Sequence, residues 1–243
     1  MRFIVYAFGF FVCVLSVFAG ATFFLFTKPW IEFSVLEYYN PGKPSILIDC
    51  EGKEWARFQV DCREPVAFSS MSPHIVNAFL AAEDHDFFSH YGISVKGIIR
   101  SSLINLYKGR IIQGASTITQ QLVKLLYFDG KRSFRRKIKE QVVALLVERQ
   151  FTKHQIIQTY LNHVYFGCGI YGVEAASQRF WGKSANALTL AQAATLAGIV
   201  RSPNNYCPLL SAENALKRRN VVLKCMENLG YITEMEYQHA RQE

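Results

Sequence analysis

The sequence has no ionisable acid or base between Phe3 and Thr27. A run of 25 apolar or weakly polar residues is long enough to cross a hydrocarbon core of about 30 Å as a helix. A cleaved signal peptide is the alternative, because Ala19-Gly20-Ala21 resembles a small-residue cleavage site. The apolar run continues beyond that site, so we expect an uncleaved anchor, with a cytoplasmic amino terminus and most of the chain outside.

The six cysteines lack the spacing of metal ligands, and the chain has no zinc-finger pattern, RNP-type motif or basic repeat. These absences argue against a dedicated metal site and against nucleic acid as a partner. Basic residues nevertheless outnumber acidic ones by 27 to 19, which fits an anionic membrane surface or a phosphorylated substrate as the partner.

Cys50 and Cys62 flank a possible hairpin and could form a disulfide in an oxidising compartment. That both are free, buried thiols is an equally good alternative. Of the other four cysteines, Cys13 lies within the predicted anchor, and Cys168, Cys207 and Cys225 are scattered along the chain.

Internal repeats and low-complexity tracts are absent, and strand signals are confined to residues 45–62. Prolines and a glycine between residues 29 and 44 indicate a juxtamembrane linker. From Ser72-Pro73, a strong helix start, the periodicity is helical to the C-terminus. We therefore expect a mainly α fold in three parts. These are a cytoplasmic tip and transmembrane anchor at 1–28, a linker and short β-hairpin at 29–64, and one helical domain at 65–243.

Three carboxylates and two histidines crowd into residues 83–92, directly after an apolar helical run at 75–82. The acids alternate with Phe87, Phe88 and Tyr91, which suggests a carboxylate held in a partly dry cleft. There its pKa can rise toward the range that suits a general base. The alternative is a polar helix end capped by Gly92.

A second helix is expected to begin at residue 117, because Thr117 and Gln120 match a capping box. Its polar face has donors and one cation but no carboxylate, so it is suited to holding an anion, and the exposed N–H groups of its first turn would add to this. That face consists of Thr117, Gln120, Gln121 and Lys124.

In the next helix, Glu140 is the only acid among five cations. It belongs to a salt-bridged surface helix, where such pairs contribute little, or it is a second carboxylate that the cations hold ionised beside a phosphate site. The five cations are Arg132, Arg135, Arg136, Lys137 and Lys139.

Residues 93–113 alternate apolar side chains with four basic ones and contain no acid. Such a segment beside a membrane anchor can lie in the lipid interface, although an ordinary packed helix would look the same. The helices after Lys153, including an alanine-rich one at 185–200, are interpreted as scaffold.

Five blocks follow one another along the chain. They are Glu83-Asp84-x-x-Phe87-x-x-His90-x-Gly92, Gly114-x-Ser116-Thr117-x-Thr119-Gln120-Gln121-Leu122-x-Lys124, Arg136-Lys137-x-x-Glu140, Tyr160-Leu161-Asn162-x-x-Tyr165-Phe166-Gly167 and Arg218-Arg219-x-x-Val222-Leu223. Together they resemble the peptidoglycan glycosyltransferases of glycosyltransferase family 51, the polymerase module of class A penicillin-binding proteins and of monofunctional transglycosylases. The similarity covers about residues 65–240. The chain departs from the family pattern at Leu125, at Lys153-His154-Gln155 and at Cys207, and none of these departures touches the two glutamates.

This resemblance implies a two-lobed, lysozyme-like domain whose smaller lobe, 93–113, dips into the bilayer. The reaction would be polymerisation of lipid II into peptidoglycan glycan strands by inverting β-1,4 transfer, with release of polyprenyl pyrophosphate. Glu83 would be the general base, and Glu140 would orient the nearby cations or assist at the leaving group. The resemblance assigns substrate contacts in three sets. Asp84, Phe87 and His90 would shape the base's pocket, Ser116, Thr117, Gln120 and Gln121 would hold sugar and phosphate oxygens, and Lys124, Arg132, Arg136 and Lys137 would stabilise the pyrophosphate.

The same resemblance requires no cofactor and no protein metal site, although magnesium or manganese could bind the pyrophosphate. Partners would be lipid II, the growing glycan, the bilayer, and other cell-wall synthesis and division proteins. The protein would be a single-pass protein of the bacterial inner membrane, with its catalytic domain on the outer face. No Ser-x-x-Lys transpeptidase core is present, so the chain as given is monofunctional. Two alternatives stay open: a membrane-anchored lysozyme-like hydrolase or lytic transglycosylase, and a non-catalytic glycan-binding scaffold.

Overall fold

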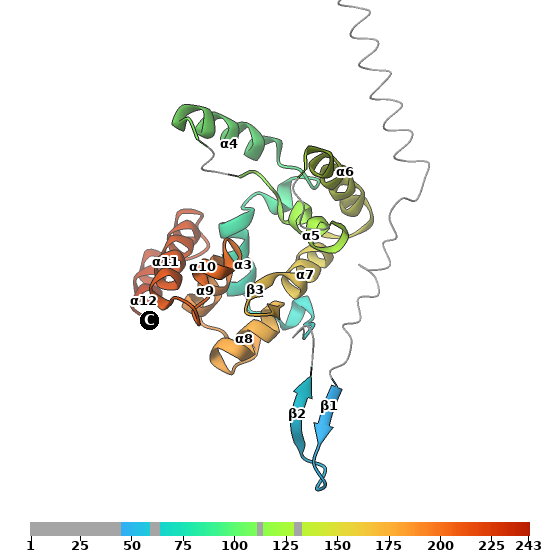
Figure 1. Cartoon of the computed structure of the whole chain (residues 1–243). Helices are drawn as coiled ribbons and strands as arrows, with labels where there is room; N and C mark the ends of the chain where they lie inside the picture. The colour runs from blue at the N-terminus through green and yellow to red at the C-terminus, as the bar shows by residue number, and fades with distance from the viewer. Residues whose placement is uncertain (1–44, 59–63, 111–113, 129–132) are drawn as a thin grey trace, which may run out of the picture. The chain divides into compact units, whose positions relative to one another are not determined.

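The computed structural model describes residues 45–58, 64–110, 114–128 and 133–243. The predicted anchor at 3–27, Cys13, Cys62 and Arg132 lie outside these ranges. Within them, helices predominate, in agreement with the predicted mainly α class (Figure 1). In the part of the chain described, no helix has the length and apolar character needed to cross a membrane.

The predicted hairpin is present before the helical domain. Strands β1 (Ser45–Ile48) and β2 (Glu54–Phe58) pair antiparallel. Asp49 shapes the turn between them, because its Oδ1 accepts hydrogen bonds from the backbone N–H groups of Glu51 and Lys53, both at 2.9 Å. An aspartate that bonds the backbone of following residues is a common way to stabilise such a turn.

Helix α3 (Pro73–Glu83) begins as predicted, with the Ser72 hydroxyl accepting from the His74 N–H and Pro73 in the first turn. It packs against α9 (Leu190–Val200) and α11 (Ala212–Asn228). Helix α9 is buried along most of its length, as expected for a helix that is apolar on all sides. The short α10 (Pro203–Tyr206) and α12 (Glu234–Gln242) complete this group.

A second group consists of α5 (Ile118–Tyr127), α6 (Phe134–Gln150) and α7 (Lys153–His163), in which α5 packs on both of the others. Phe79 of α3 links the two groups. Its ring meets those of Tyr160 and Phe166 edge-on, each with centroids 6.2 Å apart, a favoured aromatic arrangement. The site described below lies where α3 of the first group approaches α5 of the second.

The second half of the chain differs from the sequence expectation in two places. A small hairpin of β3 (Tyr165–Gly167) and β4 (Ile170–Tyr171) follows α7, although no further strands were expected. The alanine-rich segment begins with a 3₁₀ turn, η3 (Ala185–Ala187), and the helix itself begins only at residue 190, where Thr189 and Gln192 form a capping box. Helix α8 (Val173–Trp181) lies between these two features.

The basic segment at 93–113 contains helix α4 (Val95–Lys108), at the top of Figure 1. It is N-capped by Ser94 and ends at Gly109, whose φ of 63° is left-handed. Apolar side chains on successive turns of one face are exposed to solvent, which accords with the amphipathic pattern of the sequence. These are Val95, Ile99, Leu103 and Leu106.

The stretch after α3 is not a helix end capped by Gly92, so that alternative is wrong. Helix α3 ends at Glu83, and the chain continues through a 3₁₀ turn, η2 (Phe87–Ser89). Gly92 has a φ of 82°, and a Cβ there would lie 2.8 Å from the Ala144 carbonyl oxygen of α6. Its own carbonyl accepts a hydrogen bond from the Thr117 hydroxyl at 2.6 Å. Only glycine fits this turn, which joins the acidic stretch to α5 and α6.

Candidate active site

Glu83 is the last residue of α3, and its two carboxylate oxygens have different surroundings. Oε2 accepts a hydrogen bond from Gln121 Nε2 at 2.8 Å, while Oε1 is buried and has no hydrogen-bond partner among the described residues. Burial raises the pKa of Glu83 above its ordinary value, against the opposing effects of the Gln121 hydrogen bond and the charges of Arg201 and Arg218. A carboxylate with a raised pKa and one unpartnered oxygen is equipped to accept a proton.

Tyr160 determines how Gln121 faces Glu83. The Tyr160 hydroxyl donates to Gln121 Oε1 at 3.1 Å, so the amide must present its NH₂ group to the carboxylate. Tyr160 is fully buried in α7, and burial raises the pKa of its phenol well above the ordinary value. The phenol therefore stays protonated and remains a donor, which keeps the amide in this orientation.

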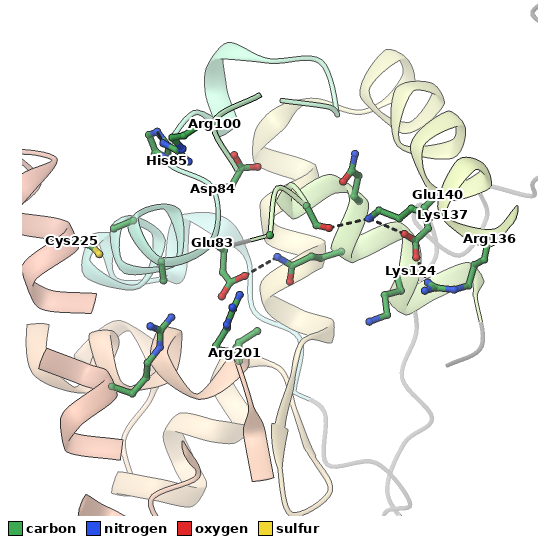
Figure 2. Close-up of a pocket in the computed structure, with 18 residues that line it drawn as sticks. Glu83, Asp84, His85, Arg100, Lys124, Arg136, Lys137, Glu140, Arg201 and Cys225 are labelled. Atoms are coloured by element: carbon green, nitrogen blue, oxygen red, sulfur yellow. Dashed lines mark hydrogen bonds and ion pairs between the residues drawn. The ribbon is translucent and has the colours of Figure 1, made fainter. Parts of the chain in front are cut away.

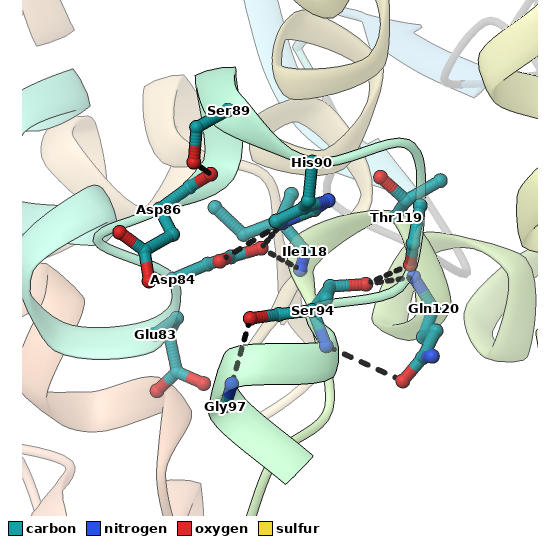
Figure 3. A network of polar contacts seen from close by, with 12 residues as sticks. Glu83, Asp84, Asp86, Ser89, His90, Ser94, Gly97, Ile118, Thr119 and Gln120 are labelled. Atoms are coloured by element: carbon teal, nitrogen blue, oxygen red, sulfur yellow. Dashed lines mark hydrogen bonds and ion pairs between the residues drawn. The ribbon is translucent and has the colours of Figure 1, made fainter. Parts of the chain in front are cut away.

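Asp84 joins the acidic stretch to the start of α5, as Figure 3 shows. The buried Asp84 carboxylate lies 3.0 and 3.1 Å from His90 Nε2 and accepts from the Ile118 backbone N–H at 3.0 Å. An acid at a helix N-terminus satisfies an otherwise unpaired donor there. Asp84 and His90 thus hold the backbone beside Glu83 in place.

The cations of α6 surround a second buried carboxylate (Figure 2). Glu140 is only 2% exposed and pairs with Arg136 through Oε1 and with Lys137 Nζ through Oε2 at 3.2 Å. Lys137 also donates to Ser116 Oγ at 2.9 Å. The interpretation as an ordinary surface salt bridge is therefore wrong, because the Glu140 carboxylate is buried and is compensated by two cations. Removal of one partner from such a pair leaves an uncompensated buried charge.

Both carboxylates line one cleft of about 730 Å³. Lys124, Arg136 and Lys137 lie on the α5 and α6 side, whereas Arg201 directly follows α9 and Arg218 lies on α11. A polar cleft with a buried base and several cations is suited to a substrate that carries both hydroxyl groups and an anion. Ala81, Ala82, Asp84, His85, Arg100, Gly114, Ser116, Gln120, Gln121, Val200 and Cys225 also line it.

Three of the expected substrate contacts do not line this cleft. Phe87 is fully buried, and His90 is held against Asp84. Thr117 is 1% exposed, because its hydroxyl caps α5 and donates to Gly92. Phe87 and His90 thus support the wall beside Glu83, and Thr117 lines a smaller adjoining pocket with Glu83 and Asp84. Their contact with a substrate stays a prediction.

Gln120 borders the cleft but has little surface with which to bind a substrate. Its side chain is 2% exposed and completes the capping box by accepting from the Thr117 N–H. The predicted polar face of α5 therefore divides in two. Thr117 and Gln120 start the helix, and Gln121 and Lys124 face the cleft.

A model of the transglycosylase family matches residues 51–227. The chain belongs to this family. Penicillin-binding protein 1A of Aquifex aeolicus is 41% identical to it over 229 residues, and that of Escherichia coli is 36% identical over 246 residues. The alignments cover 93% and 100% of this transglycosylase chain. These matches confirm the predicted similarity to the glycosyltransferase module of class A penicillin-binding proteins.

This transglycosylase chain spans only about a third of those relatives, 32% and 29% of their lengths. The crystal structure of penicillin-binding protein 1A from Haemophilus influenzae superposes on 83% of the chain and 20% of its own, with a TM-score of 0.48 and 25% identity. The family assignment rests on the sequence matches.

The transglycosylase cleft includes residues that the sequence interpretation had left in the scaffold. Arg201 follows the buried helix α9, and Arg218 lies on α11, yet both act electrostatically on Glu83. Arg218 stands in the last of the five blocks, which was the one available signal for it. Arg201 belongs to none of the blocks. Across the described residues, no three His, Cys, Asp or Glu side chains gather as a metal site would require.

Proposed function

We propose that this transglycosylase domain polymerises lipid II by inverting β-1,4 glycosyl transfer and releases polyprenyl pyrophosphate. The observation that carries the proposal is the shared cleft, which is lined both by the buried carboxylate of Glu83 and by the cations Lys124, Arg136 and Lys137. A sugar hydroxyl needs a base, and a pyrophosphate leaving group needs positive charge. The cleft offers both.

In this reaction, Glu83 Oε1 accepts the proton of the acceptor sugar's 4-hydroxyl group. The hydroxyl oxygen attacks C1 of the growing chain, the bond from C1 to the pyrophosphate oxygen breaks, and the configuration at C1 inverts. A positioned general base contributes about 10²–10⁴-fold to such a step. The raised pKa of Glu83 favours this role, because a stronger base takes the proton more readily.

Positive charge on the other side of the cleft would stabilise the departing pyrophosphate. Lys124 is exposed to the cleft, while Arg136 and Lys137 are held by the buried Glu140. Fixed charges need no rearrangement when negative charge develops on the leaving oxygen. We therefore propose that Glu140 positions these two cations. Arg132, which lies outside the described residues, would stabilise the pyrophosphate as Lys124, Arg136 and Lys137 do.

A divalent cation would carry part of the pyrophosphate charge when bound. Two of the three acids that line the cleft are poor candidates to hold one, because Glu140 is paired with two cations and Asp84 with His90 and a backbone N–H. The third is Glu83, which is the proposed base. Magnesium or manganese would therefore be held chiefly by the pyrophosphate oxygens. No step above depends on it.

A lipid-linked substrate also accounts for the exposed apolar face of α4. We propose that this face enters the outer leaflet of the bacterial inner membrane, that residues 3–27 anchor the chain there, and that the domain at 65–243 has two lysozyme-like lobes. Arg100, on the same helix, lines the cleft, so α4 connects the membrane surface to the site. The bilayer and the growing glycan would be partners, together with other cell-wall synthesis proteins.

The test is incubation of the full chain in detergent with labelled lipid II, followed by separation of products by length. Long glycan that a muramidase degrades supports the proposal. Shortening of pre-formed glycan without polymerisation would favour a hydrolase. Binding of lipid II with neither reaction would favour a scaffold.

A further inference from the structure

Two thiols that lie far apart in sequence face each other at the edge of the domain. Cys168 lies in the turn between β3 and β4, and Cys207 follows α10. Their Sγ atoms are 3.9 Å apart. Sequence spacing had led us to regard these cysteines as scattered, and for this pair that interpretation is wrong.

The backbones around the two thiols are also in close contact. A Cβ on Gly167 would lie 3.3 Å from the Pro203 carbonyl oxygen and 3.5 Å from Cys207 Cβ. The turn therefore rests directly on α10. A disulfide needs its sulfurs about 2.05 Å apart, so the two Sγ atoms, which lie 3.9 Å apart, must approach by about 1.9 Å to form the bond.

We propose that Cys168 and Cys207 form a disulfide that joins the β3–β4 turn to the end of α10. Cys168 is exposed and Cys207 is buried, so a disulfide oxidant can reach the first thiol and the second can then displace it. Formation requires an oxidising compartment and thus depends on the proposed location of the domain outside the membrane. It does not depend on the glycosyltransferase reaction.

The chemistry is two thiol–disulfide exchanges. The Cys168 thiolate attacks a small-molecule or protein disulfide and releases one thiol. The Cys207 thiolate then attacks Cys168 Sγ and releases the second thiol, so two electrons pass from the cysteines to the oxidant and both protons go to the released thiols. Burial raises the pKa of Cys207, so ring closure speeds up as the pH rises above neutral.

The bond would brace one wall of the site. A smaller cavity of about 150 Å³ shares Gln121, Lys124 and Val200 with the main cleft and is also lined by Tyr165 and Pro203. Tyr165 lies in the strand before Cys168, and Pro203 begins the helix before Cys207. The cross-link would therefore hold these two lining segments together.

The test exposes the reduced full chain in detergent to oxidised glutathione, blocks remaining thiols and maps a tryptic digest without reductant. The expected product joins the peptide of residues 154–179 to that of 202–217. The thermal midpoint should rise by roughly 10 °C on oxidation, because a loop of this length is closed in the unfolded chain. Dithiothreitol should reverse the rise.

Cys168→Ser should abolish the joined peptide and the part of the oxidation-dependent rise that this bond causes, while Cys225→Ser should keep both. Both variants retain Cys50 and Cys62, so any rise from that pair is common to them and the difference between the two variants measures the Cys168–Cys207 bond. Recovery of Cys168 and Cys207 as separately blocked or glutathione-modified peptides would overturn the proposal. An oxidation-dependent rise of equal size in Cys168→Ser would do so as well.

Discussion

Gln121 Nε2 lies 2.8 Å from Glu83 Oε2, and the buried Tyr160 hydroxyl holds that amide in a single orientation. One oxygen of the base is thereby occupied, and the other, Oε1, is left to take a proton. The hydrogen bond also limits how far burial raises the Glu83 pKa. Position and basicity of the carboxylate thus depend on the same amide.

Replacing Gln121 by Leu should therefore change the pH profile of polymerisation. Without the hydrogen bond, the pKa of Glu83 rises further, and activity is lost at a higher pH as the medium is acidified, because the base must be ionised. A hydrogen bond to a charged group contributes about 1.5–3 kcal/mol, so kcat/KM at neutral pH should fall on the order of tenfold or more. Initial rates measured from pH 5 to 9 give the profile.

Tyr160→Phe is the milder companion variant, since it keeps the ring and removes only the donor that orients the amide. The acidic limb of its pH–rate profile should also shift to higher pH, but by less than in Gln121→Leu. If both variants lowered the rate equally at every pH, the amide would serve folding and not the basicity of Glu83.

Glu83→Gln should stabilise the fold at neutral pH. Because the folded pKa is raised above the ordinary value of 4.5, the native state binds a proton more tightly than the unfolded state. Stability that is present below that value is lost as the pH rises through the folded pKa. The variant avoids this loss, so its thermal midpoint should exceed that of the wild type at pH 7 and match it near pH 4. A midpoint below the wild type at pH 7 would contradict the shift.

Glu140→Gln should weaken both stability and catalysis. Removing one partner of a buried ion pair costs about 3–5 kcal/mol, and Arg136 and Lys137 would lose the group that positions them. The matched control is Glu213→Gln, which breaks an exposed pair with Lys217 on α11 and should leave the thermal midpoint unchanged. Equal effects of the two substitutions on midpoint and rate would show that burial of Glu140 has no special importance.

Leu103→Trp should report contact between α4 and lipid. In proteoliposomes with brominated acyl chains, the new tryptophan should be quenched beyond the level of the native ones, because the residue lies on the exposed apolar face. Leu229→Trp, on another exposed apolar position at the end of α11, should add unquenched emission. Equal quenching at the two positions would argue against an α4-specific contact.

Local sequence signals predicted the parts of the fold that depend on neighbouring residues. Ser72-Pro73 marked the start of α3, and Thr117 with Gln120 marked the start of α5. The same capping box shows the limit of such reasoning, because its side chains were also assigned to the substrate while the helix start already occupied them. A polar residue can satisfy the backbone or a ligand, and spacing alone does not distinguish the two.

Residues that approach one another only through tertiary packing were harder to predict. Tyr160 of α7, Arg201 after α9 and Arg218 of α11 all act on the Glu83 region. Helical periodicity identifies the buried face of each helix but not which distant residue it meets. Cys168 and Cys207 illustrate the same point, since 39 positions separate two thiols that are in contact.

The most direct test of the central claim compares Glu83→Gln with the wild type in two assays, binding of lipid II and single-turnover glycan formation. If Glu83 is the general base, binding should stay within about threefold, while the rate should fall by about 10²–10⁴-fold. Retention of more than a tenth of the wild-type rate would contradict the assignment of Glu83 as the base.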